Sequence, residues 1–135
     1  MNGYKPRIMD SLLEKKLQAK GAVLIEGPKW CGKTTTAEEV AASKILLART
    51  DVKNNFKSLL EIDTDAALSG HTPMLIHEWQ AVPKLWDAVR YTVDHRRKMG
   101  QFILTGSAVP DKKAEEEREH SGTGRFAWLT MRPMT

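Results

Sequence analysis

Short apolar runs alternate along this chain with longer segments in which apolar residues recur at helical spacing. Each run is four to six residues long, and the first, Ala22-Val23-Leu24-Ile25-Glu26, contains two β-branched residues. Runs of this kind are typical of strands that are buried on both faces of a parallel sheet. The pattern therefore predicts five strands, at residues 22–26, 45–48, 73–77, 102–105 and 126–131.

The segments between these runs predict helices. Ile8, Leu12, Leu13 and Leu17 predict the first helix, and further helical segments are expected over residues 35–43, 49–68 and 83–99. Proline is tolerated in the first turn of a helix, so the last segment is expected to begin at Pro83 and to stop at Gly100. One face of that helix carries Leu85, Trp86, Val89 and Val93. Strands that alternate with helices predict an α/β fold, a three-layer sandwich with a parallel sheet between two layers of helices.

Composition narrows the class of protein without changing this picture. The 135 residues suffice for one domain, and 41% hydrophobic with 28% charged residues is ordinary for a globular protein. There is no apolar run of membrane-spanning length and no signal peptide, and the single cysteine, Cys31, excludes an internal disulfide framework. We therefore expect a cytoplasmic protein with no membrane partner. The charged segment at residues 111–120 is expected to be an exposed loop or a loose helix.

The segment between the first strand and the second helix carries the strongest chemical signal. Gly27-Pro28-Lys29-Trp30-Cys31-Gly32-Lys33-Thr34 matches the pattern G-x-x-x-x-G-K-[ST]. Such a loop wraps a phosphate chain with backbone N–H groups, and the following helix N-terminus favours negative charge. We expect ATP and Mg²⁺ here, with Lys33 on the β- and γ-phosphates and the Thr34 hydroxyl on the metal. The expected nucleotide contacts are Gly27, Pro28, Lys29, Trp30, Cys31, Gly32, Lys33, Thr34 and Thr35.

Two residues at the end of the third strand bear on ATP hydrolysis. Glu78 lies where a carboxylate would polarise the attacking water, and the alternative is an exposed carboxylate at a strand end. His77 occupies the position of a magnesium-associated aspartate. Imidazole is a poor ligand for Mg²⁺, which prefers oxygen. Nucleotide binding is therefore expected to survive, whereas hydrolysis is expected to be weakened or lost.

Two further residues are candidates for the catalytic site. Ser107, after the fourth strand, is placed to touch the γ-phosphate or the lytic water, and the alternative is a turn that Ser107 caps. Arg125, before the fifth strand, is a candidate arginine finger towards a neighbouring subunit. The alternative for Arg125 is a surface ion pair with an acid of the Glu115-Glu116-Glu117 run.

Several strings together resemble one group of proteins. GPKWCGKTT, LIHEWQ followed by VPKLWDAVR, QFILTGSA and HSGTGR with MRPM are similar to prokaryotic AAA-type ATPases that carry an N-terminal ATPase module and a C-terminal DUF4143 domain. The resemblance implies a P-loop core with sheet order 5-1-4-3-2 and a possible homo-oligomer. It implies that Lys33 and Thr34 are the Walker A residues and that Glu78 is the Walker B glutamate. It also implies that Ser107 is the sensor-1 residue, that Arg125 is an arginine finger, and that the adenine binds near Arg7.

The chain departs from this family in two places. The family pattern reads LIDEWQ, so His77 replaces its Walker B aspartate. The family also continues beyond a motif like MRPM, so we expect residues 1–135 to be a single truncated ATPase domain. The lid and the DUF4143-like domain, with any protein or DNA partner that they bind, would then lie outside it.

Three functions remain open from the sequence. The first is ATP binding with Mg²⁺-dependent hydrolysis, and the second is a nucleotide-binding switch, or pseudo-ATPase, without turnover. The third is a nucleic-acid-associated module with a basic stripe around Arg90, Arg96 and Arg97. The chain has no N-K-x-D string for reading guanine, which favours adenine.

Overall fold

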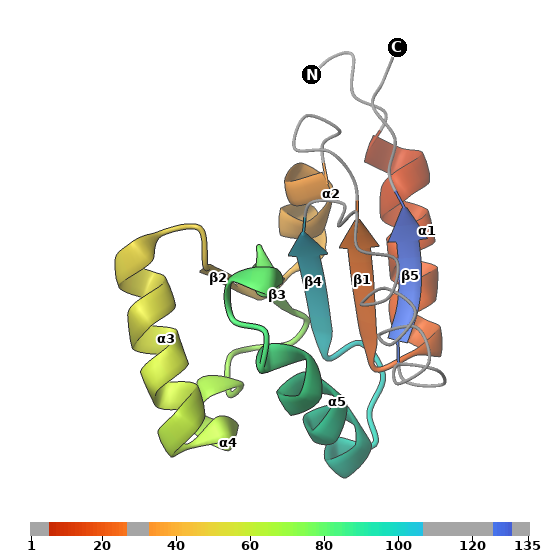
Figure 1. The fold of residues 1–135 in the computed structure, drawn as a ribbon. Helices are drawn as coiled ribbons and strands as arrows, with labels where there is room; N and C mark the ends of the chain where they lie inside the picture. The colour runs from red at the N-terminus through yellow and green to blue at the C-terminus, as the bar shows by residue number, and fades with distance from the viewer. Residues whose placement is uncertain (1–5, 27–32, 107–125, 131–135) are drawn as a thin grey trace, which may run out of the picture.

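The fold is built on a parallel sheet of five strands. The computed structural model describes residues 6–26, 33–106 and 126–130. The strand order is β2-β3-β4-β1-β5 (Figure 1), which is the predicted order read from the opposite edge. The strands are β1 (Ala22–Glu26), β2 (Ser43–Leu46), β3 (Met74–His77), β4 (Phe102–Gly106) and β5 (Phe126–Thr130).

The register of the strands brings three carboxyl ends to one edge of the sheet. β1 pairs with β4 as far as Glu26, which lies opposite Gly106. β3 pairs with the other side of β4 as far as His77, which lies opposite Thr105. The segments that follow β1, β3 and β4 in sequence therefore leave the sheet at the same edge. In parallel α/β sheets this edge is where ligands bind.

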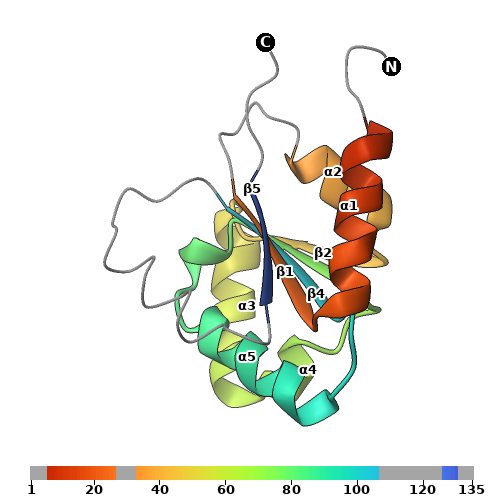
Figure 2. The ribbon, with the colours of Figure 1, turned by 90° about the vertical axis from the view of Figure 1, so that its right-hand side faces the viewer.

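Helices cover both faces of the sheet and form the outer layers of the sandwich. α1 (Pro6–Ala19) and α2 (Lys33–Val40) cover one face. The other face is covered by α3 (Thr50–Ile62), α4 (Thr64–Ala67) and α5 (Leu85–Arg96), as the view along the sheet in Figure 2 shows. None of the helices in the described parts of the chain combines the length and the apolar character needed to cross a bilayer.

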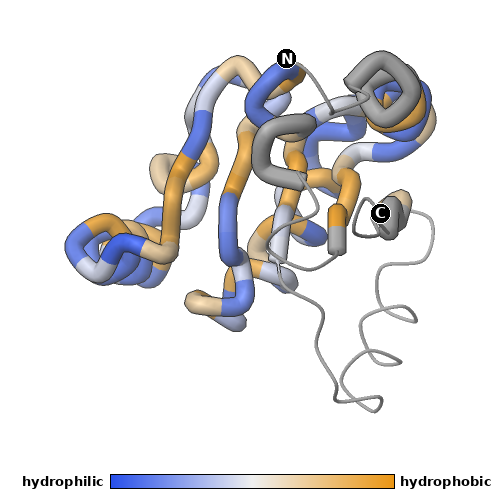
Figure 3. The backbone as a smooth tube through the Cα atoms, turned by 90° about the horizontal axis from the view of Figure 1, so that it is seen from above, coloured by the Kyte–Doolittle hydropathy of each residue, from blue (hydrophilic) through white to orange (hydrophobic). Residues whose placement is uncertain are grey.

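Each face of the sheet buries its own apolar cluster, as expected for strands hydrophobic on both sides. In β1, Val23 and Ile25 pack with Leu13 and Leu17 of α1 and with Ala37 of α2. The opposite cluster is larger and gathers buried residues of α3, α4, α5, β1, β3, β4 and β5, with Ile45 of β2 packed against it. Figure 3 shows the hydrophobic segments concentrated in the strands, with hydrophilic stretches frequent around them.

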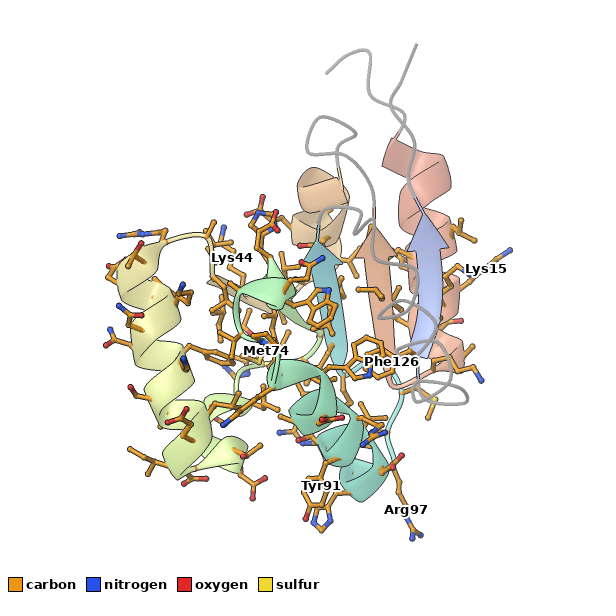
Figure 4. The ribbon with its side chains drawn as sticks, in the orientation of Figure 1. Lys15, Lys44, Met74, Tyr91, Arg97 and Phe126 are labelled. Carbon is orange, nitrogen blue, oxygen red and sulfur yellow. The ribbon has the colours of Figure 1, made fainter. Side chains whose placement is uncertain are left out.

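Aromatic side chains fill the centre of the larger cluster. Phe126 of β5, labelled in Figure 4, stacks on Trp86 of α5 with ring centroids 4.1 Å apart. Trp86 in turn lies 5.4 Å from the ring of Trp79, which follows β3. The four apolar residues predicted to share one face of α5 are all buried here: Leu85, Trp86, Val89 and Val93.

Several element boundaries differ from the prediction. α2 begins at Lys33, inside the phosphate-loop motif, and β2 begins at Ser43, two residues before the predicted start. α5 does not begin at Pro83, because a 3-10 turn, η2 (Trp79–Ala81), comes first and α5 starts at Leu85. Nor does Gly100 end α5. The helix ends at Arg96, where Arg97 adopts the left-handed conformation (φ 56°) and donates its N–H to Val93 O at 2.9 Å.

Candidate functional site

The start of α2 faces the edge where the strands end. β1 ends at Glu26, and α2 begins at Lys33, with Thr34 and Thr35 in its first turn. Figures 1 and 2 show α2 beside the carboxyl ends of β1 and β4. The N-terminus of a helix in this position offers backbone N–H groups and a favourable dipole to an anion. This is the strand–loop–helix context that the phosphate-loop motif requires.

At the end of β3, His77 is held against the neighbouring strand. Its Nδ1 lies 2.8 Å from the hydroxyl oxygen of Thr105 in β4. Leu75 and Ile103, two residues before each of them, pack in the cluster that contains Ala37 of α2. Because side chains alternate along a strand, His77 and Thr105 belong to the α2 face of the sheet. This is the face from which α2 presents its first turn.

Glu78 follows β3 directly and turns the chain out of the sheet. Its backbone is left-handed (φ 59°, ψ 52°), which is uncommon for a residue other than glycine. The Glu78 N–H donates to Thr105 O at 2.7 Å, so the turn is tied to β4. The side chain is half-buried. Unusual backbone conformations of this kind are concentrated at functional sites, and this one lies at the edge predicted to hold the phosphates.

The structure thus brings together part of the predicted site. Lys33, Thr34 and Thr35 at the start of α2 lie at the same edge of the sheet as Glu78. Arg7 is in the first turn of α1. The remaining predicted residues fall outside the described ranges: Gly27, Pro28, Lys29, Trp30, Cys31, Gly32, Ser107 and Arg125.

Sequence reasoning missed Thr105 as a member of this site. Thr105 is fully buried, and it contacts His77 through its side chain and Glu78 through its backbone carbonyl. A signal was present, because Thr105 is the polar residue at the end of the apolar run Phe102-Ile103-Leu104. A polar side chain in that position is buried at the ligand-binding edge of a parallel sheet.

The donor atoms at this edge partly suit Mg²⁺. By residue type, Thr34 would offer a hydroxyl and Glu78 a carboxylate, the oxygen donors that Mg²⁺ prefers. His77 supplies an imidazole, whose Nδ1 is already in contact with Thr105. Since Mg²⁺ is commonly held by substrate phosphates and one or two protein oxygens, a hydroxyl and a carboxylate are residue types that would suffice for the ion without His77.

The arginines predicted to form a basic stripe are mostly engaged within the chain. Arg96 donates to Leu68 O at 2.8 Å and to Gln101 Oε1 at 3.1 Å. Arg90 forms an ion pair of 3.1 Å with Asp87. Arg97, labelled in Figure 4, lies at the end of the molecule opposite the carboxyl ends of the strands. Two of the three arginines of the predicted stripe therefore have partners within the chain, and the nucleic-acid role of the stripe stays a prediction.

The fold and this edge of the sheet define a nucleotide-binding, ATPase-like domain. Residues 19–135 match the family described as "AAA domain", and the chain belongs to that family. Uncharacterized proteins of Mycobacterium bovis and Mycobacterium tuberculosis are each 33% identical to it over 100 residues. The match covers 73% of this chain but 22% of each relative, so the chain spans about a fifth of their length.

A solved structure supports the fold independently of these sequences. The structure of C. elegans PCH-2 is similar to this chain with a TM-score of 0.50 at 15% identity. The similarity covers 96% of this chain and 42% of the other. At this identity the likeness concerns the arrangement of the sheet and helices alone.

Proposed function

We propose that this chain binds ATP at the carboxyl edge of its sheet and hydrolyses it with Mg²⁺. One observation carries the proposal: a G-x-x-x-x-G-K-[ST] sequence joins β1 to α2 at the edge where Glu78 leaves β3. A strand, a phosphate loop and a helix in this order form the phosphate cradle of P-loop enzymes. The carboxylate of Glu78, which follows β3 and is separated from β1 by β4, then supplies the group that a water nucleophile needs.

Each residue has a defined role in this proposal. Backbone N–H groups of Gly27 and of residues 29–32 surround the phosphates, since Pro28 has no N–H to donate, and the Lys33 ammonium binds the β- and γ-phosphates. Thr34 would hold Mg²⁺, which when bound neutralises charge on the phosphates. Glu78 orients the attacking water and accepts its proton. Ser107 contacts the γ-phosphate.

Two further assignments concern neighbours of the phosphates. We assign Arg125 as a finger that reaches the nucleotide of an adjoining subunit in a homo-oligomer, and Arg7 as a residue beside the adenine. We assign any protein or DNA partner to regions other than the phosphate site. The single cysteine supports a cytoplasmic location.

His77 supports a second candidate function, a nucleotide-binding switch without turnover. The side chain that would otherwise offer a carboxylate to the metal is an imidazole in contact with Thr105. Phosphate contacts dominate the affinity of a P-loop for nucleotide, so binding does not require that carboxylate. In this alternative, a partner recognises the ATP-bound state through the surface near Ser107 and Arg125.

One experiment separates these candidates. Phosphate release and ATP binding by calorimetry are measured for the wild type, Lys33→Ala and Glu78→Gln. We expect Lys33→Ala to lose binding at least tenfold, on the order of the 1.4 kcal/mol that one decade represents. Glu78→Gln should retain binding and lose turnover by about 100-fold or more. Wild-type binding without phosphate release would favour the switch, and no wild-type binding would refute both candidates.

A further inference from the structure

The ends of β3 and β4 are joined by three successive contacts. The first is the 2.8 Å contact between His77 Nδ1 and Thr105 Oγ1, and the second is the 2.7 Å hydrogen bond from Glu78 N–H to Thr105 O. In the third, the side-chain amide of Gln80 lies against the backbone of Gly106. In this order, the contacts involve residues successively closer to the end of β4, from Thr105 to Gly106.

The third contact depends on how the chain turns after β3. The left-handed backbone of Glu78 directs the chain into η2, where Ala81 N–H donates to Glu78 O at 3.0 Å. Trp79 is 3% exposed and packs into the larger apolar cluster, which anchors this turn. With Trp79 fixed in the core, the next residue, Gln80, is directed back over the end of β4.

Gly106 is adapted to this approach. A Cβ atom built on Gly106 would overlap the amide of Gln80, lying 2.5 Å from its Cδ and from its Nε2. Cβ atoms do not approach other heavy atoms so closely, so a larger residue at position 106 would displace Gln80. The glycine at this strand end is therefore explained by the close approach of Gln80, since glycine is the residue that lets side chains contact the backbone directly.

We propose that Gln80 is a positioning residue, whose amide fixes the end of β4 relative to Glu78. Gln80 is two residues after Glu78, and Gly106 immediately precedes Ser107. In the proposed ATPase, the contact would couple Glu78, which orients water, to the end of β4, the strand that Ser107 follows in sequence. This inference rests on the proposed ATPase function and extends it, because small misplacements of catalytic groups reduce the rate without reducing affinity.

The turnover test compares Gln80 with a glutamine that has only a structural role. Gln80→Ala should lower kcat by about tenfold or more, while the affinity for ATP changes by less than about twofold. Gln101→Met is the matched control, because Gln101 is buried at the other end of β4, where it accepts from Arg96 and donates to Met99 O. Gln101→Met should lower the melting temperature and leave kcat unchanged. A kcat for Gln80→Ala within about twofold of the wild type would overturn the proposal.

A second pair of variants separates positioning from folding. Gly106→Ala should lower kcat with little loss of stability, because the new methyl group displaces the flexible amide end of Gln80. In Gly106→Ala/Gln80→Ala the overlap is removed, so stability should stay close to that of the wild type while kcat stays low. Recovery of kcat in the double variant would overturn the proposal, because it would show that turnover depends on how the space at Gly106 is filled and not on the Gln80 amide.

A third measurement needs no turnover and so distinguishes failure of this inference from failure of the ATPase proposal. Hydrogen exchange of the Glu78 amide, which donates to Thr105 O, is followed without nucleotide. Gln80→Ala should accelerate this exchange by about tenfold or more, with amides in the middle of β1 unchanged. Unchanged protection of Glu78 would refute the coupling even if the wild type hydrolyses ATP. If exchange is accelerated in a chain that shows no ATP turnover, the coupling through Gln80 is supported and only the proposal of ATP hydrolysis is refuted.

Discussion

At the scale of single residues, the contact between His77 and Thr105 sets the chemistry of the β3 end. Thr105 fixes the orientation of the imidazole through Nδ1, at 2.8 Å. An imidazole held in this way presents nitrogen and carries no fixed negative charge, whereas a carboxylate in its place would carry one and bind Mg²⁺ or its water shell. In the proposed ATPase, the identity of residue 77 would therefore control how well this edge stabilises the metal of Mg·ATP.

This argument predicts that His77→Asp accelerates ATP turnover in Mg²⁺ by about tenfold, the lower range for residues that act on a metal through its outer shell. The Asp carboxylate can still accept a hydrogen bond from the Thr105 hydroxyl, so the β3 end should remain ordered. Phosphate release measured against Mg²⁺ concentration checks the expectation. His77→Asn is the control, because it is of similar size but uncharged and should give no acceleration. If Asp and Asn behave alike, the charge at this position does not limit turnover.

The sequence predicts roles for residues of the phosphate loop and of the β3 end, and these roles stay predictions, but it does not predict the contacts that depend on three dimensions. Lys33, Thr34 and Glu78 were identified from spacing alone, because a phosphate loop and a strand-end acid are local patterns. The left-handed backbone of Glu78 and the Gln80–Gly106 contact were not predictable. Both arise because Trp79 packs in a core formed by residues that are distant in sequence, and a local sequence pattern cannot predict such packing.

At the scale of elements, the strongly patterned segments were predicted best. β1 was predicted without error, and the four residues on one face of α5 are buried as expected. β2 was shifted by two residues. β2 is the outermost strand on one side of the sheet and is only partly buried, so its hydrophobic pattern is weak. Its register is set by pairing Ser43 with Met74 of β3, a tertiary interaction that the local sequence does not contain.

Close packing between α5 and the start of β1 gives a prediction at this scale. A Cβ atom on Gly21 would overlap Val93 Cγ1 and lie 3.1 Å from its Cγ2. Gly21→Ala should therefore destabilise the fold by about 1–3 kcal/mol, the usual cost of overpacking a core. Urea denaturation monitored by tryptophan fluorescence measures this change.

The control for this prediction is a double-mutant cycle. Val93→Ala alone leaves a cavity and is itself destabilising. Combined with Gly21→Ala, it removes the methyl groups that the new Cβ would meet, so the double variant should be more stable than the sum of the single effects implies. Additive effects would show that Gly21 is not required for the approach of Val93.

At the scale of the whole molecule, the site lies where separate parts of the fold meet. Residues from β1, β3 and β4 and the start of α2 converge on one edge of the sheet, and the two apolar clusters lie on opposite faces behind it. A ligand at this edge binds the folded chain and not the unfolded one. The sheet order was inferred from the resemblance to AAA-type ATPases. Alternation of strands and helices alone predicts parallel strands but does not determine which strands are neighbours.

This convergence predicts that nucleotide binding stabilises the entire domain, whether or not ATP is hydrolysed. At 100 times the dissociation constant, a ligand adds about 2.7 kcal/mol, which raises the melting temperature of a domain of this size on the order of 10 °C. Lys33→Ala should lose this shift, whereas Lys98→Ala, an exposed lysine away from the sheet edge, should keep it. A chelator should reduce the shift if Mg²⁺ contributes to affinity. Equal shifts in both lysine variants would mean that ATP binds somewhere other than the start of α2. The roles proposed for Glu78 and its neighbours would then be wrong.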